Sequence, residues 1–163
     1  MKPLNIKDRC TKKKLKKCDE VAKLYDKIQI AYADILDNDK SIQKIMCNVL
    51  LEDLPEGEFT SDFVCIKEDG DYMVRECVFK KKLNLPRTCK LLDASHLYWA
   101  KRGVTDWGLI VEKEQGNEWY FNYGGRCMIG FFPKIYEDEL IFSLTYCHRP
   151  STGQVRLSLD EED

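Results

Sequence analysis

The sequence has no long apolar run, because charged residues make up 33% of its 163 residues and interrupt every hydrophobic stretch. We therefore expect no membrane span and no membrane partner. The basic N-terminus also lacks the apolar segment and small-residue cleavage site of a secretory signal. These two absences favour a cytoplasmic protein.

Paired metal ligands of the zinc type are missing as well. The eight cysteines are scattered without any CxxC pair, and of the two histidines only His148 adjoins a cysteine. A structural zinc site needs closely spaced ligand pairs, so we do not expect one. In a cytoplasmic chain, scattered cysteines are expected to be small buried hydrophobic residues.

Charge is abundant but unevenly placed, although the net charge is only −2. Residues 1–17 carry eight Lys or Arg against one acid, and residues 75–102 carry eight against two, whereas the chain ends in the acidic run 160–163. Such a distribution is typical of a basic face that contacts a polyanion, with a solvated acidic tail. For the N-terminal part alone, basic residues that simply meet water explain the pattern equally well.

Hydrophobic periodicity predicts an α/β fold in which helices flank a central mixed sheet. The expected order is a helix over 12–36, a strand over 42–51, a hairpin of strands 62–67 and 72–79, a helix from Pro86 to Gly103, and a strand over 107–114. The last strand should lie parallel to its predecessor, since a helix connects the two. Beyond Asn117 we expect short strands or loops that cover the sheet, with a short helix over 133–139.

The length fits one core with terminal extensions. We divide the chain into a basic N-terminal arm (1–17), an α/β core (18–116), an aromatic and glycine-rich extension packed on the core (117–159), and an acidic tail (160–163).

The predicted hairpin carries the most informative side chains. Asp62 enters the first strand and Glu76 lies in the second, so two carboxylates could share a Mg²⁺ ion, as metal-dependent phosphodiester hydrolysis requires. A period of two places Glu76, Val78 and Lys80 on one strand face. Alternatively, Asp62 is a turn residue and Lys80 belongs to a solvated strand end. A carboxylate such as Glu76, flanked by Cys and Val, needs a partner or a metal if it is buried.

The order of an acid, a hairpin, a Glu-containing strand, a helix and a strand resembles the PD-(D/E)xK nuclease core. More closely, residues 20–114 resemble the N-terminal catalytic domain of TnsA-type transposon endonucleases, through Ser61-Asp62-Phe63, Glu76, and the run Tyr98-Trp99 to Gly103 to Trp107. The resemblance implies a restriction-endonuclease-like fold and DNA cleavage with Mg²⁺ or Mn²⁺ bound by Asp62 and Glu76.

The sequence departs from the family pattern at two positions. Val78 stands where the family has its catalytic lysine, so Lys80 would have to replace it, and Gln29 stands where the family has a glutamate on the first helix. The resemblance thus implies Asp62, Glu76, Lys80 and Gln29 as catalytic positions.

Two functions fit these observations. One is a metal-dependent DNA endonuclease of a mobile element, working with a transposase subunit. The other is a degenerate nuclease fold that acts by binding DNA or a protein, for example as an inhibitor of a host defence nuclease of the CRISPR type. In either case the expected nucleic-acid contacts are Lys81, Lys82, Arg87, Lys90, Lys101 and Arg102.

Overall fold

The chain forms a mixed β-sheet with a helix on each face, which confirms the α/β class. The computed structural model describes residues 1–83, 85–111, 122–123, 126–130 and 142–146. Their elements, in chain order, are β1 (Lys2–Pro3), β2 (Thr11–Lys13), β3 (Ala22–Leu24), α1 (Lys27–Asn38), β4 (Ile42–Leu50), β5 (Phe59–Lys67), β6 (Tyr72–Cys77), the 3₁₀ turn η1 (Lys80–Lys82), α2 (Pro86–Lys101), β7 (Asp106–Val111), β8 (Asn122–Tyr123), β9 (Arg126–Gly130) and β10 (Phe142–Tyr146).

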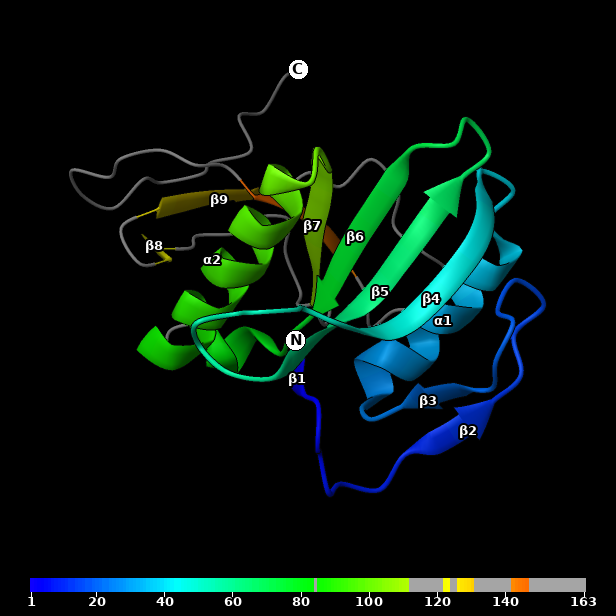
Figure 1. Cartoon of the computed structure of the whole chain (residues 1–163), viewed down its shortest axis with the longest axis horizontal. Helices are drawn as coiled ribbons and strands as arrows, with labels where there is room; N and C mark the ends of the chain where they lie inside the picture. Colours follow the sequence, from blue (N-terminus) through cyan, green and yellow to red (C-terminus); the bar gives the residue numbers. More distant parts are fainter. Residues whose placement is uncertain (84, 112–121, 124–125, 131–141, 147–163) are drawn as a thin grey trace, which may run out of the picture.

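The sheet is antiparallel except at one pair of strands. Strands β4, β5 and β6 follow one another as antiparallel neighbours, and β7 lies parallel to β6 after the crossover through α2. The parallel pair was predicted from the helix between the two strands, and Figure 1 shows it at the centre of the sheet. Beyond β7 the order continues β10, β9, β8.

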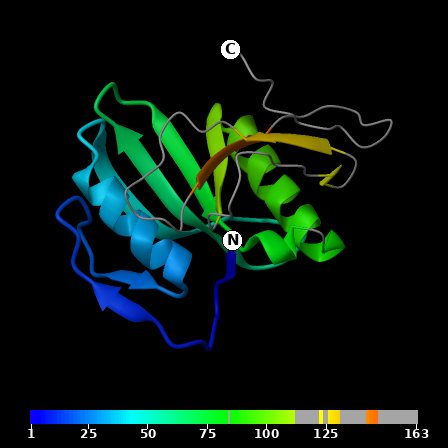
Figure 2. The same ribbon diagram turned by 180° about the vertical axis from the view of Figure 1, so that it is seen from behind.

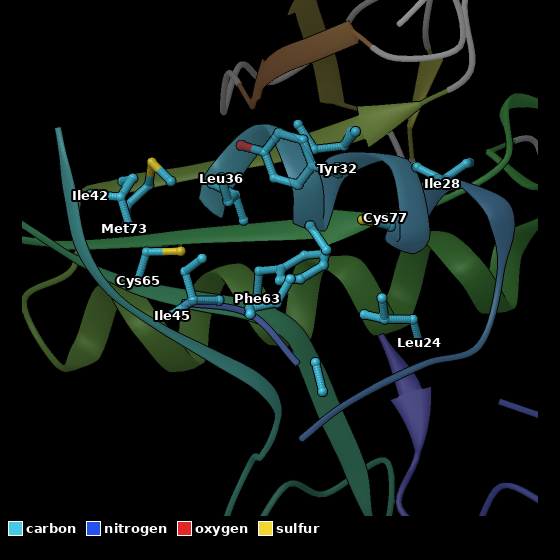
Figure 3. Close-up of a cluster of buried hydrophobic side chains, with 14 residues drawn as sticks. Leu24, Ile28, Tyr32, Leu36, Ile42, Ile45, Phe63, Cys65, Met73 and Cys77 are labelled. Carbon is cyan, nitrogen blue, oxygen red and sulfur yellow. The ribbon is translucent and has the colours of Figure 1, made fainter. Parts of the chain in front are cut away.

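Each face of the sheet is covered by one helix, as the opposite views of Figures 1 and 2 show. One apolar cluster joins α1 to the sheet through residues such as Tyr32, Leu36 and Phe63, which Figure 3 shows packed together. The other cluster joins α2 to the sheet and includes Leu92 and Trp99. Neighbouring strand residues alternate between the clusters, because side chains of a strand point to opposite faces.

The predicted hairpin and second helix are confirmed, together with the residues that delimit them. Gly70 has φ +88° in the turn between β5 and β6, and Gly103 has φ +80° just after α2. Glycine adopts these left-handed conformations without the steric cost that a side chain brings. Pro86 occupies the first turn of α2, where its missing N–H costs no helical hydrogen bond.

The helix expected over 12–36 is shorter than predicted. It begins at Lys27, because Asp26 caps it by accepting a hydrogen bond from the Gln29 amide, and residues 11–24 instead form the β2–β3 hairpin. Within that hairpin Ala22 and Leu24 are buried in strand alternation, whereas Val21 is 52% exposed. The helical spacing of these residues was therefore misleading.

Short strands follow Asn117, as expected, but their place in the sheet differs from the expectation. Strand β10 pairs with β7 and β9 pairs with β10, so these strands extend the sheet at its edge instead of covering a face. The helix predicted over 133–139 lies outside the described residues. Within the part of the chain that the structure describes, none of the helices has the length and apolar character needed to cross a membrane.

Replacing Phe63 with alanine should lower the free energy of unfolding by about 3–5 kcal/mol, because its fully buried ring packs edge-on against Tyr32 between α1 and the sheet. Chemical denaturation measures this change. Leu97→Ala is the control: that side chain is 48% exposed on α2, so its loss should change stability by less than about 0.5 kcal/mol. Equal effects of the two substitutions would contradict the packing described.

Candidate functional site: an acidic pair at a strand fork

The candidate site lies where β5 and β6 separate. Pairing between these strands ends at Phe63 and Arg75. Toward the N-terminal end of β5, the short strand β1 pairs instead with Phe59 and Thr60. Thr60 also pairs with Leu50 of β4, so β1 must occupy the same edge of β5 that β6 has left. The N-terminus therefore enters the fork, and Figure 1 shows it beside the C-terminal end of β6.

Two carboxylates close the fork, because each accepts a hydrogen bond from a backbone amide of the opposite strand. The Asp62 amide donates to Glu76 Oε2 at 3.0 Å, and the Cys77 amide donates to Asp62 Oδ2 at 2.8 Å. Both carboxylates are 0% exposed. Where ordinary strand pairing stops, each acid thus satisfies an amide that the neighbouring strand no longer reaches.

The amino group of Met1 lies between the two acids. Its nitrogen is 2.9 Å from Asp62 Oδ2 and 3.0 Å from Glu76 Oε2. Two buried carboxylates therefore converge on one cation, which offsets the cost of burying them. The adjacent Lys2 forms an ion pair with Asp26, which anchors β1 to the start of α1.

Gln29 also contacts this pair, although through its amide nitrogen. Gln29 Nε2 donates to Asp62 Oδ1 at 2.9 Å, whereas Gln29 Oε1 accepts from the Tyr25 amide at 2.7 Å. Because the Tyr25 N–H needs an acceptor, it fixes the orientation of the amide group. The residue at the family's glutamate position thus donates to Asp62 and does not present an oxygen to a metal.

The second helix supplies a polar residue that the sequence did not single out. Ser95 Oγ donates to Glu76 Oε1 at 2.7 Å and accepts from Trp107 Nε1 at 3.1 Å. Trp99 Nε1 similarly donates to Ser61 Oγ at 2.8 Å. The spacing of buried Leu92, Ser95 and Trp99 along one helix face could have identified Ser95 as a core hydroxyl.

At the fork, burial and the attraction between opposite charges have opposing effects on the pKa of each group. Burial, with a further contribution from the charge of Glu76, raises the pKa of Asp62, while the Met1 ammonium opposes this rise. Burial alone would lower the pKa of the Met1 amino group, but the Asp62 and Glu76 charges outweigh it and raise that pKa to about 10. The ammonium form is therefore the stable one at neutral pH.

Lys80 lies beyond the end of the strand to which it was assigned. Strand β6 ends at Cys77, and Lys80 begins the turn η1 with a side chain that is 8% exposed. The period of two that placed Lys80 beside Glu76 no longer applies after the strand ends. Val78, at the family's lysine position, is part of the apolar cluster under α2.

The six predicted nucleic-acid contacts are all exposed, and they fall into two groups. Lys81, Lys82, Arg87 and Lys90 lie on η1 and the first turns of α2, whereas Lys101 and Arg102 lie at its other end. Ten helical residues separate Lys90 from Lys101, a distance of about 16 Å along the helix or the length of roughly five base pairs.

A cavity of about 210 Å³ connects the first basic group to the fork. Met1, Cys77, Lys2, Lys82 and Arg87 are among the residues that line it. An anion that enters this cavity would therefore lie among three basic side chains.

The acidic pair fits a hard divalent ion better than a soft one. Mg²⁺ and Mn²⁺ take carboxylate oxygens and keep several waters, so two convergent carboxylates suffice for partial coordination. Among the described residues, no group of three or more His, Cys, Asp or Glu side chains could hold a metal ion. Asp62 and Glu76 by themselves offer two convergent carboxylates, so an ion bound there would need waters or a ligand to complete its coordination.

No known family model matches the chain, and no curated protein matches it. The resemblance to TnsA-type endonucleases therefore depends on the residues quoted for it.

The contacts of Met1 predict that stability falls between pH 8 and pH 10. Below pH 8 the amino group is protonated in both the folded and the unfolded chain, and its contribution is complete; as pH rises through the folded pKa of about 10, the contribution is lost. A shift of about two units corresponds to about 3 kcal/mol. Urea denaturation at several pH values measures this loss.

The buried thiols of Cys65 and Cys77 act in the same direction, because burial raises their pKa values above that of an unfolded cysteine. The matched control is therefore the double variant Asp62→Asn/Glu76→Gln, which keeps the thiols but removes both charges. Its stability should fall less steeply over this range. Equal slopes in the two proteins would show that the Met1 ion pairs do not contribute.

Proposed function

We propose that this protein is a nucleic-acid-binding protein of the nuclease type, similar to TnsA-type endonucleases, with Asp62 and Glu76 as its metal ligands. The observation that carries this proposal is the convergence of two buried carboxylates, from adjacent strands, within 3.0 Å of one cation. Two convergent carboxylates around one positive charge are also the arrangement in which proteins bind Mg²⁺ or Mn²⁺.

The surroundings of the pair support a phosphodiester as the partner. The cavity beside the fork is lined by Lys2, Lys82 and Arg87, and further exposed cations continue along α2. Lys and Arg neutralise phosphates regardless of base sequence, so these residues would position a nucleic-acid backbone rather than read its bases.

The chain's own residues would define the metal site. A bound divalent ion would supply Lewis-acid stabilisation of charge on the phosphate. Asp62 and Glu76 would bind it, Ser95 would hold Glu76 in position, and Gln29 would do the same for Asp62. For this to occur, the Met1 ammonium must leave the fork.

Wild-type protein is expected to bind Mn²⁺ and to cleave DNA in its presence. Asp62→Asn should abolish both, because one of two charged ligands is lost while the side-chain shape is kept. Mn²⁺ binding is measured by electron paramagnetic resonance, and cleavage by gel electrophoresis of supercoiled plasmid. Asp8→Asn, at an exposed position outside the fork, is the control and should leave both unchanged.

Two outcomes separate the parts of the proposal. If wild-type protein does not bind Mn²⁺, the metal site is refuted. If it binds Mn²⁺ but leaves DNA intact, the nuclease activity is refuted and the second candidate below applies.

The second candidate is a nuclease fold that binds nucleic acid or a protein without hydrolysis. The position of Val78 in the apolar cluster favours it, because no cation extends from β6 where the family has its lysine. The extensive hydrogen bonding of both carboxylates favours it too, since a metal would have to replace an internal ion pair that already neutralises them.

Under either candidate, the affinity for nucleic acid should fall with rising salt concentration, because basic residues of α2 contact phosphates. The double variant Arg87→Gln/Lys90→Gln should reduce the slope of log affinity against log salt by about two, one unit for each lost phosphate contact. Fluorescence anisotropy with a labelled duplex at several salt concentrations measures the slope. The control Lys23→Gln/Lys40→Gln removes the same charge from exposed positions away from α2 and should leave the slope unchanged. Equal slopes for both double variants would exclude α2 as the contact surface.

A further inference from the structure

A second cavity, of about 480 Å³, lies apart from the acidic pair. It is bounded by residues of the N-terminal segment, by the stretch that precedes and includes β3, and by β4. Two of the residues that line it are cysteines, Cys18 and Cys47. Both are partly exposed, in contrast to the buried Cys65, Cys77 and Cys89. These two cysteines pack against the apolar cluster under α1, as expected, but unlike the other three they are not fully buried.

Backbone contacts hold Cys18 beside the strand that carries Cys47. The Ile45 amide donates to the Lys17 carbonyl at 3.0 Å, and the Cys18 thiol donates to the Ile45 carbonyl at 3.2 Å. Cys47 follows Ile45 by two residues and so projects to the same side of β4. Both cysteines therefore line the same cavity, beside the same stretch of β4.

The interaction between the two thiols makes the sulfurs unequal. It is the main reason that the pKa of Cys18 is lowered. The same interaction, together with burial, raises the pKa of Cys47. Cys18 is thus the better nucleophile of the two, because the thiolate is the reactive form.

We propose that Cys18 and Cys47 form a reversible disulfide site that reacts with small disulfides such as glutathione disulfide. The Cys18 thiolate attacks one sulfur of the small disulfide and expels one glutathione thiolate. Cys47 then loses its proton to solvent, attacks the Cys18 sulfur of the mixed disulfide and expels the second glutathione. Two protein thiols are oxidised to one disulfide, and one glutathione disulfide is reduced to two glutathione molecules.

The oxidised form would differ from the reduced form mainly in its N-terminal part. A bond between Cys18 and Cys47 closes a loop that contains β3 and α1, and it attaches the segment before β3 covalently to β4. Since Gln29 lies within this loop, the contact between α1 and Asp62 would be held more tightly. Loop closure of this length should raise the melting temperature by roughly 5–10 °C.

The test is oxidation in glutathione buffers of increasing disulfide content, followed by acid trapping, intact mass and peptide mapping. Wild-type protein should lose two hydrogen atoms, give a linked peptide pair containing Cys18 and Cys47, and melt at a higher temperature. Cys47→Ser should instead retain one glutathione on Cys18, because the second thiol is missing. Cys18→Ser should form no internal disulfide.

Cys10→Ser is the matched control, since Cys10 is also partly exposed but is not among the residues that line the cavity. It should oxidise as wild type does. The proposal is overturned if wild-type protein retains bound glutathione without forming the internal bond, or if the mapped disulfide joins other cysteines. It is also overturned if Cys18→Ser loses two hydrogen atoms as readily as wild type. None of these outcomes depends on nuclease activity.

Discussion

The fork between β5 and β6 depends on a balance between burial and charge. Asp62 and Glu76 are placed deep in the protein because each accepts a hydrogen bond from a backbone amide that strand pairing leaves unsatisfied. Two anions in this position would repel each other and lose their hydration. A cation between them is therefore a requirement of the fold, whether the Met1 ammonium or another positive ion provides it.

The need for a cation between Asp62 and Glu76 affects both the stability of the fold and the proposed binding of a metal. Under the function proposed above, a metal ion would have to compete with the Met1 ammonium for the same carboxylate oxygens. The surrounding donors, Ser95 and Gln29, are compatible with either occupant, because they contact the outer oxygens Glu76 Oε1 and Asp62 Oδ1. The site is consequently organised before any ligand arrives.

Local patterns in the sequence identified most of the sheet and α2 correctly. The Asp-Gly turn, Pro86 and Gly103 each have a local steric effect, so they can be interpreted without tertiary information. By contrast, the apolar residues before Lys27 fit both a helix and a strand, and tertiary packing decided between them. The role of Met1 could not be predicted, because it arises from the pairing of β1 with β5, more than fifty residues away.

The position of Lys17 beside β4 has a further consequence for how this molecule behaves at high concentration. A strand at the edge of a sheet offers free amides and carbonyls to any other chain, which is a common route to aggregation. Here the Ile45 amide is already bonded to the Lys17 carbonyl, and Asn48, with φ +53°, interrupts the regular edge. The segment before β3 thus shields β4 from intermolecular strand pairing, so a chain that lost it would be soluble only at lower concentrations.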